Sequence, residues 1–115
     1  MNKGVSKNDY INTGMDINMK GKTVVITGFT SGIGLATAKV MARNGAFVIG
    51  VGRSESRCRQ AEKIIKSEYP ESKVSYLIAD LSSLKQVREL ACNIKKLAEK
   101  EGNGIINVLI NNAGT

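Results

Sequence analysis

The sequence of 115 residues contains no histidine and no tryptophan, one proline and only two cysteines. Cys58 and Cys92 lie far apart and form no CxxC pair. Without histidine, the chain therefore offers no zinc site of the usual Cys and His type. We expect two reduced thiols and no metal site.

Long hydrophobic runs are also missing. No apolar run approaches the roughly 20 residues that a membrane-spanning helix needs, and the N-terminus lacks the apolar core of a signal peptide. The sequence therefore predicts no membrane contact and a cytoplasmic protein.

Acidic residues are fewer than basic ones, 10 against 17, which gives a formal net charge of +7. Such a balance raises nucleic acid as a candidate partner. However, the basic residues are scattered, and the few Tyr and Phe residues do not alternate with them as they do in grooves that stack bases. We predict no nucleic-acid partner; a DNA affinity that falls steeply with salt would contradict this.

Apolar runs and amphipathic segments alternate after a polar, Asn-rich stretch at residues 1–18, which we interpret as a flexible tail. The runs predict strands at 23–27, 46–52, 73–79 and 105–110, and the segments between them predict helices at 32–45, 54–70 and 82–102. Ser83 and Gln86 form a capping-box pattern at the start of the last helix. The alternation predicts an α/β fold: a Rossmann-type doubly wound parallel sheet, incomplete, with four strands and three helices.

Three glycines lie in the turn between the first strand and the first helix, within the stretch TGFTSGIG. A helix N-terminus presents unpaired N–H groups and a partial positive charge, which together favour a phosphate. We assign Gly28 to the tight turn, Gly32 to the close approach of a pyrophosphate, and Gly34 to the packing of helix against sheet. The alternative is a plain tight turn.

The spacing of these glycines, four residues and then two, resembles the T-G-x-x-x-G-x-G turn of the short-chain dehydrogenase/reductase superfamily. The stretch NNAG, at residues 111–114, resembles the second signature of that superfamily, and IADLSSLKQVREL resembles the end of its third strand. The resemblance covers residues from about 20 to 115 and is strongest to the branch of retinol dehydrogenases and protochlorophyllide reductases. It implies that residues 19–115 are the N-terminal part of a single NAD(P)-binding Rossmann domain.

The resemblance also implies a set of cofactor-binding residues. Asp80 would contact the adenine and Asn112 would lie by the ribose, whereas Asn111 would have a structural role. For Asp80 an Asx turn, and for Asn112 a strand-end cap, remain alternatives. The full predicted set is Gly28, Thr30, Ser31, Gly32, Ile33, Gly34, Arg53, Asp80, Leu81, Asn112, Ala113 and Gly114.

The end of the second strand bears on the choice of cofactor. An acidic residue there favours NAD, whereas an arginine accommodates the 2′-phosphate of NADP. Here the strand ends without a carboxylate and Arg53 follows at once, so we predict NADP, with Arg57 or Arg59 as a candidate second contact. The nearby Glu55 keeps NAD as an alternative cofactor. A purely structural arginine at a strand end is the alternative interpretation of Arg53.

The chemistry that the resemblance implies is hydride transfer between nicotinamide and a carbonyl or alcohol carbon. The family's catalytic Ser and Tyr-x-x-x-Lys lie well beyond NNAG, and a match at Tyr69 to Lys73 is rejected because Pro70 interrupts any helix there. We therefore predict no catalytic residue in this chain, which we interpret as a fragment of an NADP-dependent oxidoreductase, inactive alone and homo-oligomeric when complete. The alternative is a non-catalytic NAD(P)-binding or redox-sensing module.

Overall fold

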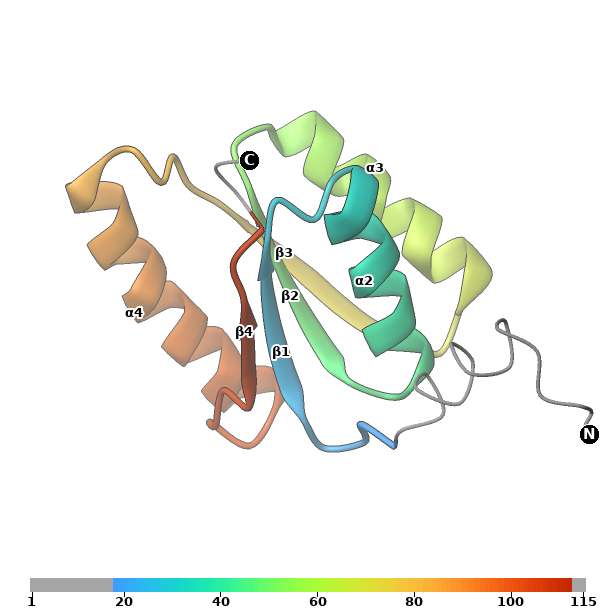
Figure 1. Ribbon diagram of the computed structural model, residues 1–115. Coiled ribbons are helices and arrows are strands. Elements are labelled where there is room, and N and C mark those ends of the chain that lie inside the picture. The colour runs from blue at the N-terminus through green and yellow to red at the C-terminus, as the bar shows by residue number, and fades with distance from the viewer. Residues whose placement is uncertain (1–17, 113–115) are drawn as a thin grey trace, which may run out of the picture.

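The computed structural model describes residues 18–112, so the predicted tail at 1–18 lies almost wholly outside the described residues. Strands and helices alternate along the described chain (Figure 1). Their bounds are β1 Thr23–Thr27, α2 Gly32–Arg43, β2 Phe47–Gly52, α3 Glu55–Glu68, β3 Lys73–Ile78, α4 Leu84–Glu101 and β4 Val108–Ile110. The prediction of four strands and three helices is confirmed.

All strand pairs are parallel, in the order β3-β2-β1-β4. Every residue of β1 is buried, because this strand lies between two others and is rich in β-branched side chains that suit a pleated surface. The fourth strand returns to pair with the first, as a Rossmann-type sheet requires. The predicted fold class is thereby confirmed.

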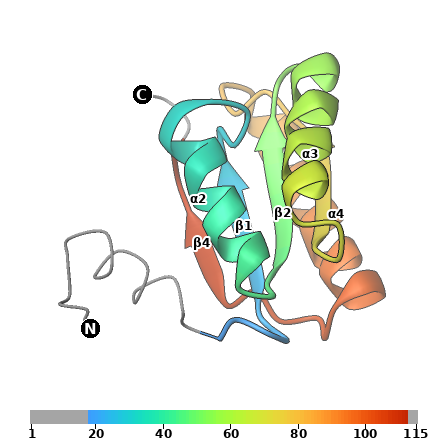
Figure 2. The ribbon, with the colours of Figure 1, turned by 90° about the vertical axis from the view of Figure 1, so that its right-hand side faces the viewer.

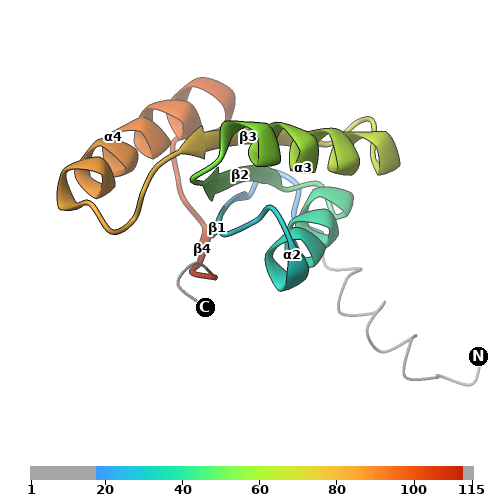
Figure 3. The same cartoon turned by 90° about the horizontal axis from the view of Figure 1, so that it is seen from above.

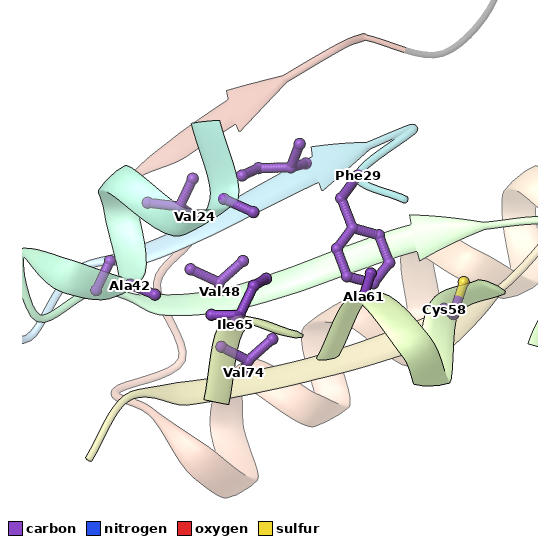
Figure 4. Packing of buried hydrophobic residues seen from close by; sticks show 11 residues of the cluster. Val24, Phe29, Ala42, Val48, Cys58, Ala61, Ile65 and Val74 are labelled. Carbon is purple, nitrogen blue, oxygen red and sulfur yellow. The ribbon is translucent and has the colours of Figure 1, made fainter. Parts of the chain in front are cut away.

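Helices cover both faces of the sheet. Helices α2 and α3 lie side by side over one face, and α4 lies on the other (Figure 2 and Figure 3). The first face carries the larger core, in which Phe29 from the loop after β1 is fully buried and points toward Ala61 (Figure 4). A Cβ at Gly50 of β2 would lie 2.4 Å from the Phe29 ring, so a glycine is needed for that ring to pack.

The last strand is shorter than predicted, since residues 105–107 do not join it. Asn107 accounts for the difference: its Oδ1 accepts a hydrogen bond from the Thr23 N–H at 2.8 Å, and its N–H donates to the Thr23 carbonyl at 2.9 Å. A side chain thus takes the place of one main-chain partner, and regular pairing begins at Val108. Ile105 and Ile106 remain exposed.

The carboxyl ends of all four strands meet at one edge of the sheet. Thr27 lies beside Val51 and Gly52 lies beside Ile78 in the register, while β4 ends at Ile110 next to β1. In open α/β sheets a ligand binds outside these carboxyl ends, where the strand order reverses. This edge is therefore the place to look for a site.

Candidate functional site

A cleft of about 1060 Å³ opens at this edge of the sheet. Residues from the loops after β1, β2, β3 and β4 line it. Nine of the predicted cofactor-binding residues are among them, namely Gly28, Thr30, Ser31, Gly32, Ile33, Arg53, Asp80, Leu81 and Asn112. Ala113 and Gly114 lie outside the described residues.

The three glycines of the loop differ in what they do. Gly28 and Gly32 have φ values of 65° and 58°, which favour glycine, and a Cβ at Gly32 would meet nothing within 4 Å. Gly34 is buried and does not line the cleft; a Cβ there would lie 2.0 Å from the Gly28 carbonyl oxygen. The geometry agrees with the three roles of turn, open approach and close packing.

The N-terminus of α2 differs from those of the other two helices. At α3 and α4 the side chains of Ser54 and Ser83 accept hydrogen bonds from the N–H groups of Arg57 and Gln86, whereas at α2 the N-cap residue, Ser31, makes no such bond. Like α4, helix α2 has no acidic residue in its first turn, whereas α3 has Glu55 there. The first N–H groups of α2 are therefore available to an anion at the cleft, which suits the pyrophosphate of a dinucleotide.

The loop after β3 is held by hydrogen bonds around Asp80. Its Oδ1 accepts hydrogen bonds from the Ser82 N–H at 3.0 Å and from the Ser82 hydroxyl at 2.7 Å. Asp80 therefore forms the Asx turn that the sequence offered as an alternative role. These two bonds lower the pKa of the Asp80 carboxyl, and the positive charge of Arg53 adds to the effect. Asp80 nevertheless lines the cleft, so the turn positions the carboxylate there.

Gln86 has a role that the capping-box pattern did not predict. Ser83 caps α4 as expected, but the Gln86 side chain accepts a hydrogen bond from the Asp80 N–H at 2.8 Å instead of returning to Ser83. It thereby ties the first turn of α4 to the loop that carries Asp80.

The two asparagines after β4 have different positions. The side chain of Asn112 donates from Nδ2 to the Gly28 carbonyl at 3.2 Å, and its N–H donates to the Thr27 hydroxyl at 2.8 Å. Asn111 accepts from the same hydroxyl at 3.1 Å and does not line the cleft. The structural role expected of Asn111 agrees with this contact, and Thr27 joins both residues to β1.

Basic residues after β2 flank the cleft. Arg53 and Arg57 line it, and among residues 18–112 neither guanidinium has a carboxylate within 4 Å. Arg59 does not line the cleft, and its guanidinium lies 3.8 Å from the Glu55 carboxylate. Of the two candidate assistants, the geometry favours Arg57.

Sequence reasoning missed several lining residues. The cleft is also lined by Val51, Gly52, Ser54, Ala79 and Ser82. Each directly adjoins a predicted residue or a strand end, so the position of the strand ends is the signal that could have found them.

The rejected Tyr69 to Lys73 match lies at the far end of the sheet. Tyr69 follows the last residue of α3, and Lys73 begins β3, with a turn closed by the Ser72 N–H to the Tyr69 carbonyl between them. The two side chains do not share a helix face, so the geometry supports their rejection as a catalytic pair. Within the described part of the chain, no three Cys, Asp or Glu side chains gather as a metal site.

The model of the short chain dehydrogenase family matches residues 22–115. The chain belongs to this family. Curated relatives of the chain include "Short-chain dehydrogenase TIC 32 A, chloroplastic" from Brassica napus, 40% identical over 98 residues, and "Retinol dehydrogenase 13" from Homo sapiens, 38% identical over 109 residues. The alignments cover 85% and 92% of this chain, but 29% and 31% of those relatives. The resemblance to the retinol dehydrogenase branch is confirmed.

Solved structures of dehydrogenases share the fold. L-Sorbose reductase from Gluconobacter frateurii, complexed with NADPH and L-sorbose, is 32% identical with a TM-score of 0.73, over 87% of this chain and 36% of that one. A metagenomic short-chain oxidoreductase in complex with NADP is 30% identical with a TM-score of 0.73, and the match covers 85% of this chain and 41% of that one. The chain spans about a third of the length of the curated relatives that it matches.

None of the helices within residues 18–112 is long and apolar enough to cross a bilayer. The cytoplasmic location stays a prediction.

Proposed function

We propose that this chain binds NADP(H) and is the cofactor-binding part, residues 19–115, of an oxidoreductase. The whole enzyme transfers hydride between the nicotinamide and a carbonyl or alcohol carbon of a small molecule, and forms a homo-oligomer. NADP supplies the hydride chemistry when bound, and the residues of this chain bind and orient its adenine half.

The observation that carries the proposal is the arrangement of charge along the cleft. At one point lies the uncapped N-terminus of α2, which accepts the pyrophosphate. Arg53, directly after β2, lines the same cleft and has no carboxylate within 4 Å among residues 18–112, which suits a 2′-phosphate. NADPH and NADP in two related solved structures add support.

The remaining predicted residues take defined places in this proposal. Gly32 lets the pyrophosphate approach the backbone, and Asp80 and Leu81 contact the adenine. Asn112 lies by the ribose nearer the reacting ring, fixed by its bonds to Thr27 and Gly28. The cleft thus receives the cofactor along the carboxyl ends of the strands.

Calorimetric titration of the chain with NADPH and NADH tests the proposal. The wild-type chain is expected to bind NADPH more tightly than NADH. Arg53→Ala is expected to lower the affinity for NADPH by at least about tenfold and to leave the affinity for NADH unchanged. Arg88→Ala is the matched control, since Arg88 is exposed on α4 and does not line the cleft. Equal affinities for the two cofactors would overturn the NADP assignment, and no binding of either would overturn the site itself.

A further inference from the structure

A polar cluster at the start of α3 lies just outside the cleft and consists of Glu55, Arg59 and Tyr76, which we call the Glu55 cluster. The Tyr76 hydroxyl donates a hydrogen bond to Oε2 of Glu55. Nη2 of Arg59 lies 3.8 Å from the same oxygen. Strand β3 and the second turn of α3 thus hold one carboxylate from two sides.

The position of Glu55 makes this arrangement consequential. Glu55 lies two residues after Arg53 and two before Arg57, and both arginines line the cleft. Ser54, the residue between Arg53 and Glu55, also lines it, whereas none of the three members of the Glu55 cluster does. The chain therefore places a carboxylate next to the proposed 2′-phosphate position and directs it elsewhere.

Tyr76 is suited to hold this carboxylate in place. Its ring is half-buried against the core beneath α2 and α3, and this packing fixes the position of the hydroxyl. A phenol is protonated at neutral pH, so Tyr76 is a donor there, and the bond to Glu55 raises the pKa of the phenol further. Arg59 is exposed and adds a weaker, screened attraction.

A released Glu55 would act against NADP in two ways. Its carboxylate could pair with the guanidinium of Arg53 or Arg57 and cancel the charge that attracts the phosphate, and it would itself repel that phosphate. A carboxylate near the ribose is also the group that accepts the 2′-OH of NAD. The direction in which Glu55 is held therefore bears on which cofactor the cleft prefers.

We propose that Tyr76 and Arg59 are positioning residues that hold the Glu55 carboxylate away from the ribose end of the cleft, and so sharpen the preference for a 2′-phosphorylated dinucleotide. This inference rests on the proposed function, because it assumes that the 2′-phosphate lies by Arg53. It assigns part of the cofactor selectivity to a residue on β3 that does not touch the cleft.

Calorimetric titration of the 115-residue chain with NADPH and NADH tests this inference. Tyr76→Phe is expected to lower the affinity for NADPH about two- to fivefold, which is the range of an exposed charge interaction. The affinity for NADH is expected to stay the same or to rise. Adding Glu55→Gln to Tyr76→Phe removes the released charge and is expected to restore the wild-type ratio of the two affinities. A change of fold alone would not be rescued in this way.

Tyr69→Phe is the matched control, because Tyr69 is also half-buried but lies at the other end of α3. It is expected to leave the ratio unchanged. Arg59→Gln, at an exposed position, gives a smaller shift in the same direction and replaces Tyr76→Phe if that variant does not fold.

The outcomes separate the two proposals. A wild-type chain without preference for NADPH overturns the proposed function and this inference with it. A wild-type preference for NADPH that Tyr76→Phe leaves intact overturns only the role of the Glu55 cluster. An equal loss of both cofactors in Tyr76→Phe, not rescued by Glu55→Gln, also overturns it, because Tyr76 would then be structural alone.

Discussion

The inner strand β2 and the edge strand β4 are held in the sheet in different ways. Strand β2 lies under α2 and α3, and five of its six residues are buried. Strand β4 has three residues, none of them fully buried, and Leu109 is 67% exposed. Hydrogen bonds of Thr23, Thr27 and Gly28 to asparagines attach β4 and its flanking residues to β1.

This difference separates two parts of the candidate site. The glycine loop and Arg53 follow buried strands, so apolar packing sets their positions. Asn112 follows a short edge strand, so polar contacts set its position. Substitutions in the first part should cost much free energy of unfolding, whereas those in the second should act through single hydrogen bonds.

Phe29→Ala is expected to have the largest effect. The ring is fully buried against Gly50, and its removal leaves a cavity, so the free energy of unfolding should fall by about 3–5 kcal/mol. Leu109→Ala, on exposed β4, should change it by less than about 0.5 kcal/mol. Urea unfolding followed by circular dichroism measures both; similar losses would show that the two parts are equally well packed.

Gly34→Ala should destabilise somewhat less, by about 2–3 kcal/mol, and should abolish dinucleotide binding. The added Cβ would overlap the Gly28 carbonyl oxygen, so the start of α2 must move away from β1. Gly32→Ala has open space and is expected to cost only the strain of its positive φ, about 1–2 kcal/mol. If the two variants unfold at the same urea concentration, the close-packing role of Gly34 is wrong.

Thr27→Val should cost about 1–2 kcal/mol, because it leaves the Asn112 N–H without its hydroxyl acceptor. It should also weaken NADPH binding, since Asn112 loses its bond to Thr27 and keeps the one to the Gly28 carbonyl. Thr23→Val is the matched control: Thr23 is buried on the same strand, but its hydroxyl makes no hydrogen bond with the described residues. An equal cost in both variants would contradict a hydrogen-bonded attachment of β4.

The two cysteines compare a buried with an exposed helix position, and the comparison needs no substitution. Cys92 is exposed on α4 and should react with a thiol reagent at once, whereas Cys58 lies on the buried face of α3 and should react only on unfolding. Burial, with a smaller contribution from the charge of Glu55, raises the pKa of Cys58 to about 11 from 9.0. The unfolded thiol ionises first as the pH rises, so this contribution to stability is complete below pH 9 and is lost towards about pH 11. Rapid reaction of both thiols in the folded chain would contradict this.

Much of the fold could be predicted because its signals are local. Strand β1 is a continuous β-branched run, and the glycine spacing after it marks the turn into α2. These patterns, together with the family resemblance that pointed to Asp80, Leu81 and Asn112, predicted nine residues that line one cleft.

Several single side-chain contacts could not be predicted. Nothing in the local pattern indicates that Phe29 packs on Gly50, that Gln86 turns back to Asp80, or that an asparagine side chain shortens β4. The first and the last depend on which residues the parallel register brings together, and near-continuous apolar strands do not specify that register. The second depends on the direction that the Gln86 side chain takes, which the capping-box pattern did not predict.

The central claim is that a dinucleotide lies across the loops at the carboxyl ends of the strands. Amide chemical shifts of the isotope-labelled chain, recorded by NMR during titration with NADPH, test it most directly. The account predicts that the amides of Gly28, Gly32 and Ser82 shift, while those of Gly45 and Gly102, at the opposite end of the sheet, stay in place. Shifts centred on Gly45 and Gly102, with the glycine loop unchanged, would contradict it.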